Sequence, residues 1–241
     1  MKVKSSKKDH PNISIGMKRA LLQLNYDLDL IKSSVESNSE YGFSFGHSID
    51  AKGDLTQVEL AVLYLEDRRF FSHSGIELIS LLRGVKRFLQ GYPLGGVSTI
   101  DQQVVRISLR RYERSFSRKL NELLLALIVN IHLPKKAIFN YYIHNAYLGY
   151  KIEGCEIAAN KIFGNTAASL DANQAAFIAS LFPLPFPKAV WEVYEVDPLY
   201  PFSSPEQILI LAESVSPRWA ERIKYRYRLA KKFHFFRPKS L

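Results

Sequence analysis

Two carboxylates, Glu66 and Asp67, end an apolar run in the stretch LYLEDRRFFSHSG. Upstream, Thr56 and Glu59 have the spacing of a capping box at the start of a helix, and apolar residues then recur on one helix face. Glu66 follows the last residue of that face, so we expect partial burial to disfavour its charged form and raise its pKa. A carboxylate with a pKa closer to neutral pH is suited to act as a general base.

A second acid, Glu122, stands in the stretch RKLNE behind two cations, Arg118 and Lys119. In a helix, Arg118 and Glu122 lie four residues apart on the same face, where they can hold each other and a phosphate group together. This spacing indicates a candidate site for a phosphate-bearing ligand.

The composition limits the classes of protein to consider. The chain has 241 residues, of which 47% are hydrophobic, enough for one large domain or two modest lobes with a core. Its single cysteine, Cys155, excludes an intramolecular disulfide and a cysteine-rich zinc site. A formal net charge of +10 favours nucleic acid, anionic lipid or a phosphate-bearing substrate as partner, without choosing among them.

Basic residues concentrate near both ends of the chain, and those in residues 218–239 alternate with aromatic residues. This mixture suits a bilayer interface, although nucleic-acid binding uses it too. The first thirty residues lack the apolar core of a signal peptide, and the most apolar run, LLLALIVNIHL, is too short to cross a bilayer. We therefore predict a basic mobile tail at residues 1–12, no signal peptide and no transmembrane helix in this sequence.

Apolar periodicity predicts a mainly α protein with few strands. The predicted helices cover residues 16–35, 56–66, 76–90, a segment from residue 99 onward, 118–133, 135–147, 157–163, 170–182 and 205–236, the last with an interruption at Pro217. Between them we predict a polar loop over residues 36–55, with a short strand at 41–45. Residues 183–205 should form an irregular connection, because prolines break helices.

Four motifs follow one another in a fixed order. They are E-D-x-x-F-x-x-H-x-G at residues 66–75, G-x-S-T-x-x-Q-Q at 96–103, R-K-x-x-E at 118–122 and Y-x-x-x-x-Y-x-G at 142–149. With them the sequence resembles the peptidoglycan glycosyltransferases of family 51, the transglycosylase domain of bifunctional penicillin-binding proteins and of their monofunctional relatives. The resemblance runs from about residue 55 to about residue 187.

The resemblance implies a lysozyme-like, two-lobed transglycosylase domain over residues 13–241, with a smaller membrane-facing lobe at about residues 91–112 and a basic aromatic C-terminal helix at about 205–236. It implies polymerisation of lipid II into glycan strands, with inversion at the anomeric carbon and release of polyprenyl diphosphate. Such a reaction needs a base for the acceptor hydroxyl and positive charge for the departing diphosphate.

Catalytic roles carry over to Glu66, as the base, and to Glu122, as a second carboxylate that would orient cations or a metal ion around the diphosphate. The implied substrate-binding residues are Asp67, Phe70, His73, Arg83, Gly96, Ser98, Thr99, Gln102, Gln103, Arg106, Arg118 and Lys119. No protein ligands for a resident metal are implied.

Several of these residues also have a plainer interpretation. Phe70 is more typical of a core, His73 of a contact to a neighbouring loop, and Gln102 and Gln103 of ordinary polar helix positions. Asp67 would hold the geometry of the site. The two arginines after it, Arg68 and Arg69, are interpreted as surface charge.

The sequence also departs from the family pattern. Arg106 stands where the family usually has lysine, which keeps the charge and adds a planar fork. Asp101 stands at a usual threonine, and we expect it to repel a diphosphate unless Arg106 or a metal ion neutralises it. The remaining departures are Asn140 and Gln174 at frequent glutamates and His144 at a frequent asparagine. They leave the chemistry possible, because both catalytic glutamates are present.

The resemblance implies lipid II, lipid-linked glycan and the membrane surface as partners, together with cell-wall synthesis proteins, on the outer face of the cytoplasmic membrane. It requires no cofactor, with Mg²⁺ or Mn²⁺ as an optional activator at the diphosphate. Two alternatives remain open: a non-catalytic relative that binds lipid-linked precursor or a cell-wall partner, and a lysozyme-like glycan hydrolase. Nucleic-acid binding ranks last, because no nucleic-acid motif accompanies the charge.

Overall fold

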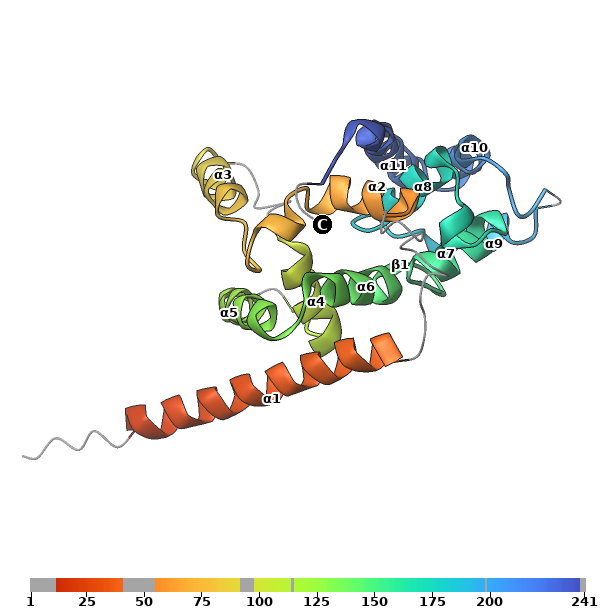
Figure 1. Ribbon diagram of the computed structural model, residues 1–241. Coiled ribbons are helices and arrows are strands. Elements are labelled where there is room, and N and C mark those ends of the chain that lie inside the picture. Colours follow the sequence, from red (N-terminus) through yellow and green to blue (C-terminus); the bar gives the residue numbers. More distant parts are fainter. Residues whose placement is uncertain (1–11, 41–54, 92–97, 114, 198, 239–241) are drawn as a thin grey trace, which may run out of the picture.

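The computed structural model describes residues 12–40, 55–91, 98–113, 115–197 and 199–238 (Figure 1). Within these ranges the protein is mainly α, as predicted. Its helices are α1 (Asn12–Glu40), α2 (Gln57–Glu66), α3 (Leu78–Leu89), α4 (Ile100–Leu109), α5 (Phe116–His132), α6 (Lys135–Asn145), α7 (Cys155–Phe163), α8 (Ala172–Ser180), α9 (Lys188–Tyr194), α10 (Pro205–Val215) and α11 (Pro217–Ala230). Three short 3-10 helices complete the helical part: η1 (Phe70–Ser72), η2 (Ala167–Ser169) and η3 (Lys231–Phe235).

Strands β1 (Tyr147–Gly149) and β2 (Ile152–Glu153) form an antiparallel hairpin after α6. The helix predicted over residues 135–147 therefore ends at Asn145, and its last residues belong to β1. Residues 1–11 of the predicted tail, the short strand predicted at 41–45 and Gly96 lie outside the described residues, and Asn12, which was placed in the tail, is the first residue of α1.

Two predicted boundaries are wrong. Helix α1 continues through residues 36–40, where a loop was predicted, because these polar residues include no glycine or proline to end the helix. Helix α9 lies inside the predicted irregular connection. Pro187 stands just before its first turn, so no intrahelical hydrogen bond is lost, and Trp191 and Tyr194 bury its inner face.

Pro217 divides the predicted C-terminal helix into α10 and α11, as anticipated. It is tolerated at the first position of α11, where a backbone N–H would have no intrahelical partner. The chain then continues into η3.

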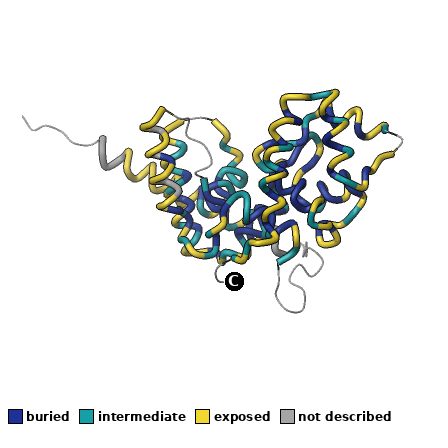
Figure 2. The backbone as a smooth tube through the Cα atoms, turned by 90° about the horizontal axis from the view of Figure 1, so that it is seen from above, coloured by how far each residue is buried: buried dark blue, intermediate teal, exposed yellow. Residues whose placement is uncertain are grey.

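The helices pack in two neighbouring groups. In one, α2 lies against α8, and α11 covers both; in the other, α4 lies between α5 and α6. Buried residues run through both halves of the molecule (Figure 2). Because α2 ends in Glu66 and α4 begins just after Thr99, the second motif meets the first where the two groups join.

The long helix α1 runs along one edge of the molecule, beneath α4, α5 and α6 (Figure 1). Ile31 and Val35 bury its inner face. The fully buried carboxylate of Asp27 accepts two hydrogen bonds from the guanidinium of Arg111, with nitrogen–oxygen distances of 2.6 and 2.9 Å, and a third at 2.8 Å from Gln23. This ion pair fastens α1 to the segment between α4 and α5. Among the described residues, none of the helices combines the length and the hydropathy needed to span a bilayer.

Candidate active site

Glu66 is held at the end of α2 by two donors from distant parts of the chain. Its Oε2 accepts a hydrogen bond from Nε2 of Gln103 in α4, at 3.1 Å, and its Oε1 pairs with the guanidinium of Arg226 in α11. Burial raises the pKa of Glu66, and the charge of Arg226 and the hydrogen bond from Gln103 oppose that rise. The expected upward direction is confirmed, and the side chain remains 11% exposed.

Asp67 links the first two motifs. It ends α2, and its Oδ2 accepts the backbone N–H of Ile100 at 3.2 Å and contacts Nε2 of His73 at 3.0 Å. On the other side of this junction, Thr99 caps α4 and donates from its hydroxyl to the carbonyl of Gly75 at 2.7 Å. These contacts agree with the interpretation of Asp67 as the residue that holds the geometry of the site.

Gly75 explains why the first motif ends in glycine. Its φ is +90°, and a Cβ atom there would lie 2.3 Å from the carbonyl oxygen of Ala126 in α5. Any other residue would clash with the α5 backbone, so the close approach of this loop to α5 requires glycine.

The second carboxylate, Glu122, is surrounded by three cations. Arg106 binds it through two nitrogens at 3.1 and 3.2 Å, and Arg118 and Lys119 pair with one oxygen each. Burial raises the pKa of Glu122, but the hydrogen bonds and charges of its cations outweigh burial and hold this pKa below its usual value. One carboxylate therefore neutralises one of three positive charges, and an excess remains for an anionic ligand.

Lys119 connects this cluster to the second motif. Its Nζ donates to Oγ of Ser98 at 2.9 Å and to Oε1 of Gln102 at 2.6 Å, in addition to its pair with Glu122. Burial lowers the pKa of Lys119, against the opposing influence of Glu122. Ser98 also lines the hollow that reaches Glu66, so Lys119 links the cluster around Glu122 to the wall of that hollow.

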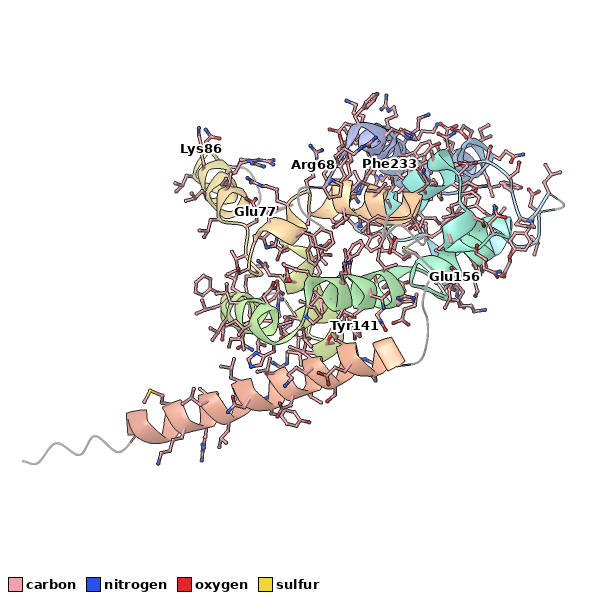
Figure 3. All side chains as sticks on the ribbon, in the orientation of Figure 1. Arg68, Glu77, Lys86, Tyr141, Glu156 and Phe233 are labelled. Atoms are coloured by element: carbon pink, nitrogen blue, oxygen red, sulfur yellow. The ribbon has the colours of Figure 1, made fainter. Side chains whose placement is uncertain are left out.

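That hollow has a volume of about 680 Å³. Its charged lining is Glu66, Asp67, Arg68, Arg69, Glu77, Arg83 and Arg226. Figure 3 shows Arg68 between α3 and Phe233 of the C-terminal segment, and Glu77 at the end of α3 where that helix begins. Arg83, on α3, is exposed and free to meet a ligand from that side.

Asp101 behaves differently from the expectation. It is fully buried, and both of its oxygens bind Nζ of Lys135 in α6, at 2.9 and 3.0 Å, while Asn130 of α5 donates to one of them. Burial raises the pKa of Asp101, and Lys135 opposes that rise. Lys135, and not Arg106, is thus its cationic partner, and the predicted repulsion of a diphosphate is not supported.

Asp67, His73 and Asp101 bring three ligand atoms within 4.8 Å of one another, the geometry of a metal site. The ammonium group of Lys135 already bridges both oxygens of Asp101. The oxygens of Asp101 are thus already bound by Lys135, and a divalent cation would have to displace this ammonium group.

Several residues predicted to bind substrate lie beneath the site instead. Phe70 is 1% exposed and packs on Phe139, because η1 turns it into the core, so it cannot meet a ligand. Gln102 is also buried, and Gln103 points at Glu66, whereas Thr99, although 3% exposed, is part of the lining of the hollow. The plainer interpretation of Phe70 and His73 is the one the structure supports.

Arg68 and Arg69, interpreted as surface charge, both have partners. Arg69 forms an ion pair with Glu77, and the guanidinium carbon of Arg68 lies 4.0 Å from the ring centre of Tyr64. Arg68 is exposed and the side chain of Arg69 is 41% exposed, so the interpretation as surface charge agrees with the structure, and both arginines line the hollow.

The other departures from the family pattern lie within helix contacts. Gln174 forms the capping box of α8 with Asp171 and donates to the carbonyl of Ser203 at 2.9 Å. In α6, Nδ1 of His144 lies 2.8 Å from the carbonyl of Asn140, and burial lowers the pKa of His144. None of the three lines the hollow around Glu66.

Three residues of the site were missed by sequence reasoning: Arg226, Lys135 and Tyr142. Arg226 lies 160 residues from its partner Glu66, in a helix whose charges were assigned to a bilayer interface. Lys135 directly follows Pro134 at the start of α6 and has no acid nearby in the sequence. Only Tyr142 carried a signal, because it opens the fourth motif.

A mainly α domain with one largely buried carboxylate in a hollow, and a second bound by three cations, is consistent with a lysozyme-like transglycosylase domain. Residues 52–195 match the family described as Transglycosylase, and the chain belongs to this family.

Named relatives agree. The chain is 39% identical over 122 residues to penicillin-binding protein 1A of Pseudomonas aeruginosa, covering 50% of this chain and 15% of that protein. It is 37% identical over 126 residues to the biosynthetic peptidoglycan transglycosylase of Alcanivorax borkumensis, covering 52% and 51%, and 37% identical over 130 residues to that of a Marinomonas species, covering 54% and 58%. The match thus spans about half the length of the two transglycosylases.

Proposed function

We propose that this protein polymerises lipid II into glycan strands, with inversion at the anomeric carbon and release of polyprenyl diphosphate. The observation that carries the proposal is the pairing of a buried base with a separate cationic cluster in one site. Glu66 faces the hollow, and Ser98 joins that hollow to the cations around Glu122. Membership of the family and the names of the relatives support the same reaction class.

In this proposal Glu66 removes the proton from the acceptor hydroxyl. Burial raises its pKa, so the carboxylate is a stronger base than an exposed one, while Arg226 keeps it from becoming protonated too readily. The hydroxyl oxygen attacks the anomeric carbon from the side opposite the diphosphate, and that geometry inverts the configuration.

The departing diphosphate gains negative charge as the glycosidic bond breaks. Arg106, Arg118 and Lys119 lie together around Glu122 and can share that charge, with Glu122 holding them in place. No cofactor is needed for these steps. A divalent cation at the diphosphate would be an optional activator.

A glycan hydrolase is the less favoured enzyme. Paired carboxylates also cleave glycosides, but a neutral glycan gives no role to three clustered cations. A relative that only binds lipid-linked precursor is suggested by Asp101 and by the altered fourth motif, and the pairing of Asp101 with Lys135 weakens the first of these grounds.

The membrane surface is the partner we infer for an apolar face beside the site. The outer side of α5 exposes Phe116, Leu120, Leu124 and Ile131 at helical spacing. Helix α3 adds further exposed apolar residues, and Figure 1 shows α3, α5 and the first turns of α1 at the same side of the molecule. A lipid-linked substrate would then enter from the bilayer, on the outer face of the cytoplasmic membrane, where cell-wall synthesis proteins also act.

Incubation of the purified protein with lipid II in detergent tests the proposal. We expect glycan strands that a muramidase digests, together with free polyprenyl diphosphate. Release of soluble fragments from cell-wall sacculi, without polymer from lipid II, would instead establish the hydrolase. Saturable binding of lipid II without turnover would establish the binding protein.

A further inference from the structure

Tyr142 stands directly behind the contacts of Glu66. It lies on α6, its side chain is buried, and its hydroxyl donates to Oε1 of Gln103 at 2.8 Å. The other end of the same amide, Nε2 of Gln103, donates to Oε2 of Glu66 at 3.1 Å. Tyr142, Gln103 and Glu66 thus form a chain of hydrogen bonds that runs from α6 through α4 to the end of α2.

The amide of Gln103 has one accepting end and one donating end, and the two are nearly equal in size. Rotation by 180° would turn its carbonyl oxygen toward the carboxylate of Glu66, where two acceptors repel each other. It would also leave the Tyr142 proton without the acceptor it now has, at a cost of about 1–3 kcal/mol for a buried polar group. Tyr142 therefore favours the orientation in which Gln103 donates to Glu66.

Tyr142 is suited to this task because it stays protonated. Burial raises its pKa well above the ordinary value, and the charge of Glu66 raises it further. Its hydroxyl therefore remains a donor over the whole pH range in which Glu66 titrates.

We propose that Tyr142 is a positioning residue, which acts through Gln103 to hold a hydrogen-bond donor against the Glu66 carboxylate. The inference rests on the proposed function of Glu66 as the base, and it assigns a role to the fourth motif. A purely structural role would rest on the ring alone, which packs 5.0 Å from the ring of Phe182. The hydroxyl distinguishes the two roles.

The test is a direct titration of Glu66. NMR monitors it through the signal of the side-chain carboxyl carbon in protein that carries labelled glutamate. The Glu66 signal is identified by its absence from Glu66→Gln. In Tyr142→Phe the amide of Gln103 is free to turn, and the ionised form of Glu66 loses its donor. The midpoint of the Glu66 titration should move upward by about one pH unit, the equivalent of about 1.4 kcal/mol.

Tyr194→Phe is the matched control. Tyr194 lies on α9, outside the hollow around Glu66. Its hydroxyl is also buried, donates to the carbonyl of Ile162 and accepts the backbone N–H of Phe202 at 3.0 Å. It should lower the melting temperature and leave the titration of Glu66 in place.

An unchanged midpoint in folded Tyr142→Phe overturns the proposal. If that variant does not fold, Gln103→Met, which keeps the side-chain length and removes the donor, must raise the midpoint by a similar amount, and an unchanged midpoint there overturns it too. The titration needs no substrate. Failure of the protein to polymerise lipid II would therefore contradict the proposed function, while the titration would still show whether Tyr142 acts on Glu66 through Gln103.

Discussion

At the scale of residues, the site depends on opposing influences on two carboxylates. Burial raises the pKa of Glu66 more than Arg226 and Gln103 lower it, whereas the cations around Glu122 outweigh burial and lower its pKa. The two acids are therefore driven in opposite directions by their surroundings. Such a difference is typical of a base and a charge-holding partner in one active site.

Arg226→Met tests the first of these influences. Without the guanidinium of Arg226, less charge opposes the effect of burial on Glu66, so the pKa of Glu66 should rise further. Because Glu66 acts as a carboxylate, the rate rises with pH as the group loses its proton, and the acid limb of the pH–rate profile should move upward by about one pH unit or more. Activity should partly recover at alkaline pH.

The matched control is Arg222→Met, on the same helix and one turn away, which makes no contact with Glu66. Its acid limb should stay in place. An acid limb that does not move in Arg226→Met would show that the ion pair does not govern the base.

Local spacing predicted the residue contacts that lie within one helix. The pair Arg118–Glu122 and the partial burial of Glu66 followed from the positions of neighbours in the sequence. Contacts between elements did not follow, because Arg226 and Lys135 reach their acids only after the helices have packed. Asp101 was misjudged for the same reason: its charge is visible in the sequence, and its partner is not.

At the scale of elements, α1 lies outside the family match, as do α10 and α11, and the fold nevertheless fastens it near the site. Arg111, which holds Asp27 of α1, lines the same small hollow as Arg106 and Arg118. Helix α1 thereby supports the segment that leads from α4 into α5 and its cations.

Arg111→Met should release α1. It leaves the carboxylate of Asp27 buried with only Gln23 as a donor. We expect a loss of about 2–3 kcal/mol in the free energy of unfolding, below the full value for a buried pair because Arg111 is about a third exposed. Urea denaturation measures this loss. Arg19→Met, on an exposed position of α1, should change stability by less than about 0.5 kcal/mol, and equal losses in both variants would refute the fastening role.

The start of α2 was predicted from its capping box, and the same kind of local pattern begins α4, α5 and α8. The capping boxes of α2 and α8 and the caps of α4 and α5 combine a side-chain acceptor with the N–H groups of the first turn, a purely local pattern. The end of α1 was missed because residues 36–40 carry no apolar pattern, although no glycine or proline ends the helix there. Helix α9 was missed because the packing of Trp191 and Tyr194, and not a local signal, holds this short helix.

At the scale of the whole molecule, the exposed apolar residues of α5 lie on the side from which a membrane-bound substrate would reach the site. Leu120→Glu combined with Ile131→Glu should weaken binding to anionic vesicles by more than about tenfold, because each change removes an apolar side chain that the bilayer would cover. Co-sedimentation with vesicles measures the effect.

Ile210→Glu is the matched control, because Ile210 is 67% exposed on α10, at the opposite side of the molecule in Figure 1. It should bind vesicles as the unsubstituted protein does. Equal binding by the α5 variant and the unsubstituted protein would place the membrane contact elsewhere. The division of the chain into a large and a membrane-facing lobe stays a prediction, with part of the proposed smaller lobe outside the described residues.

The measurement that tests the central claim most directly is the rate of lipid II polymerisation by Glu66→Gln beside the unsubstituted protein. Glutamine keeps the size of the side chain and its contact with Gln103, and removes the base. We predict that the unsubstituted protein forms glycan strands and that Glu66→Gln is slower by about 10²–10⁴-fold. Polymer formed equally fast by both proteins would contradict the assignment of Glu66 as the catalytic base.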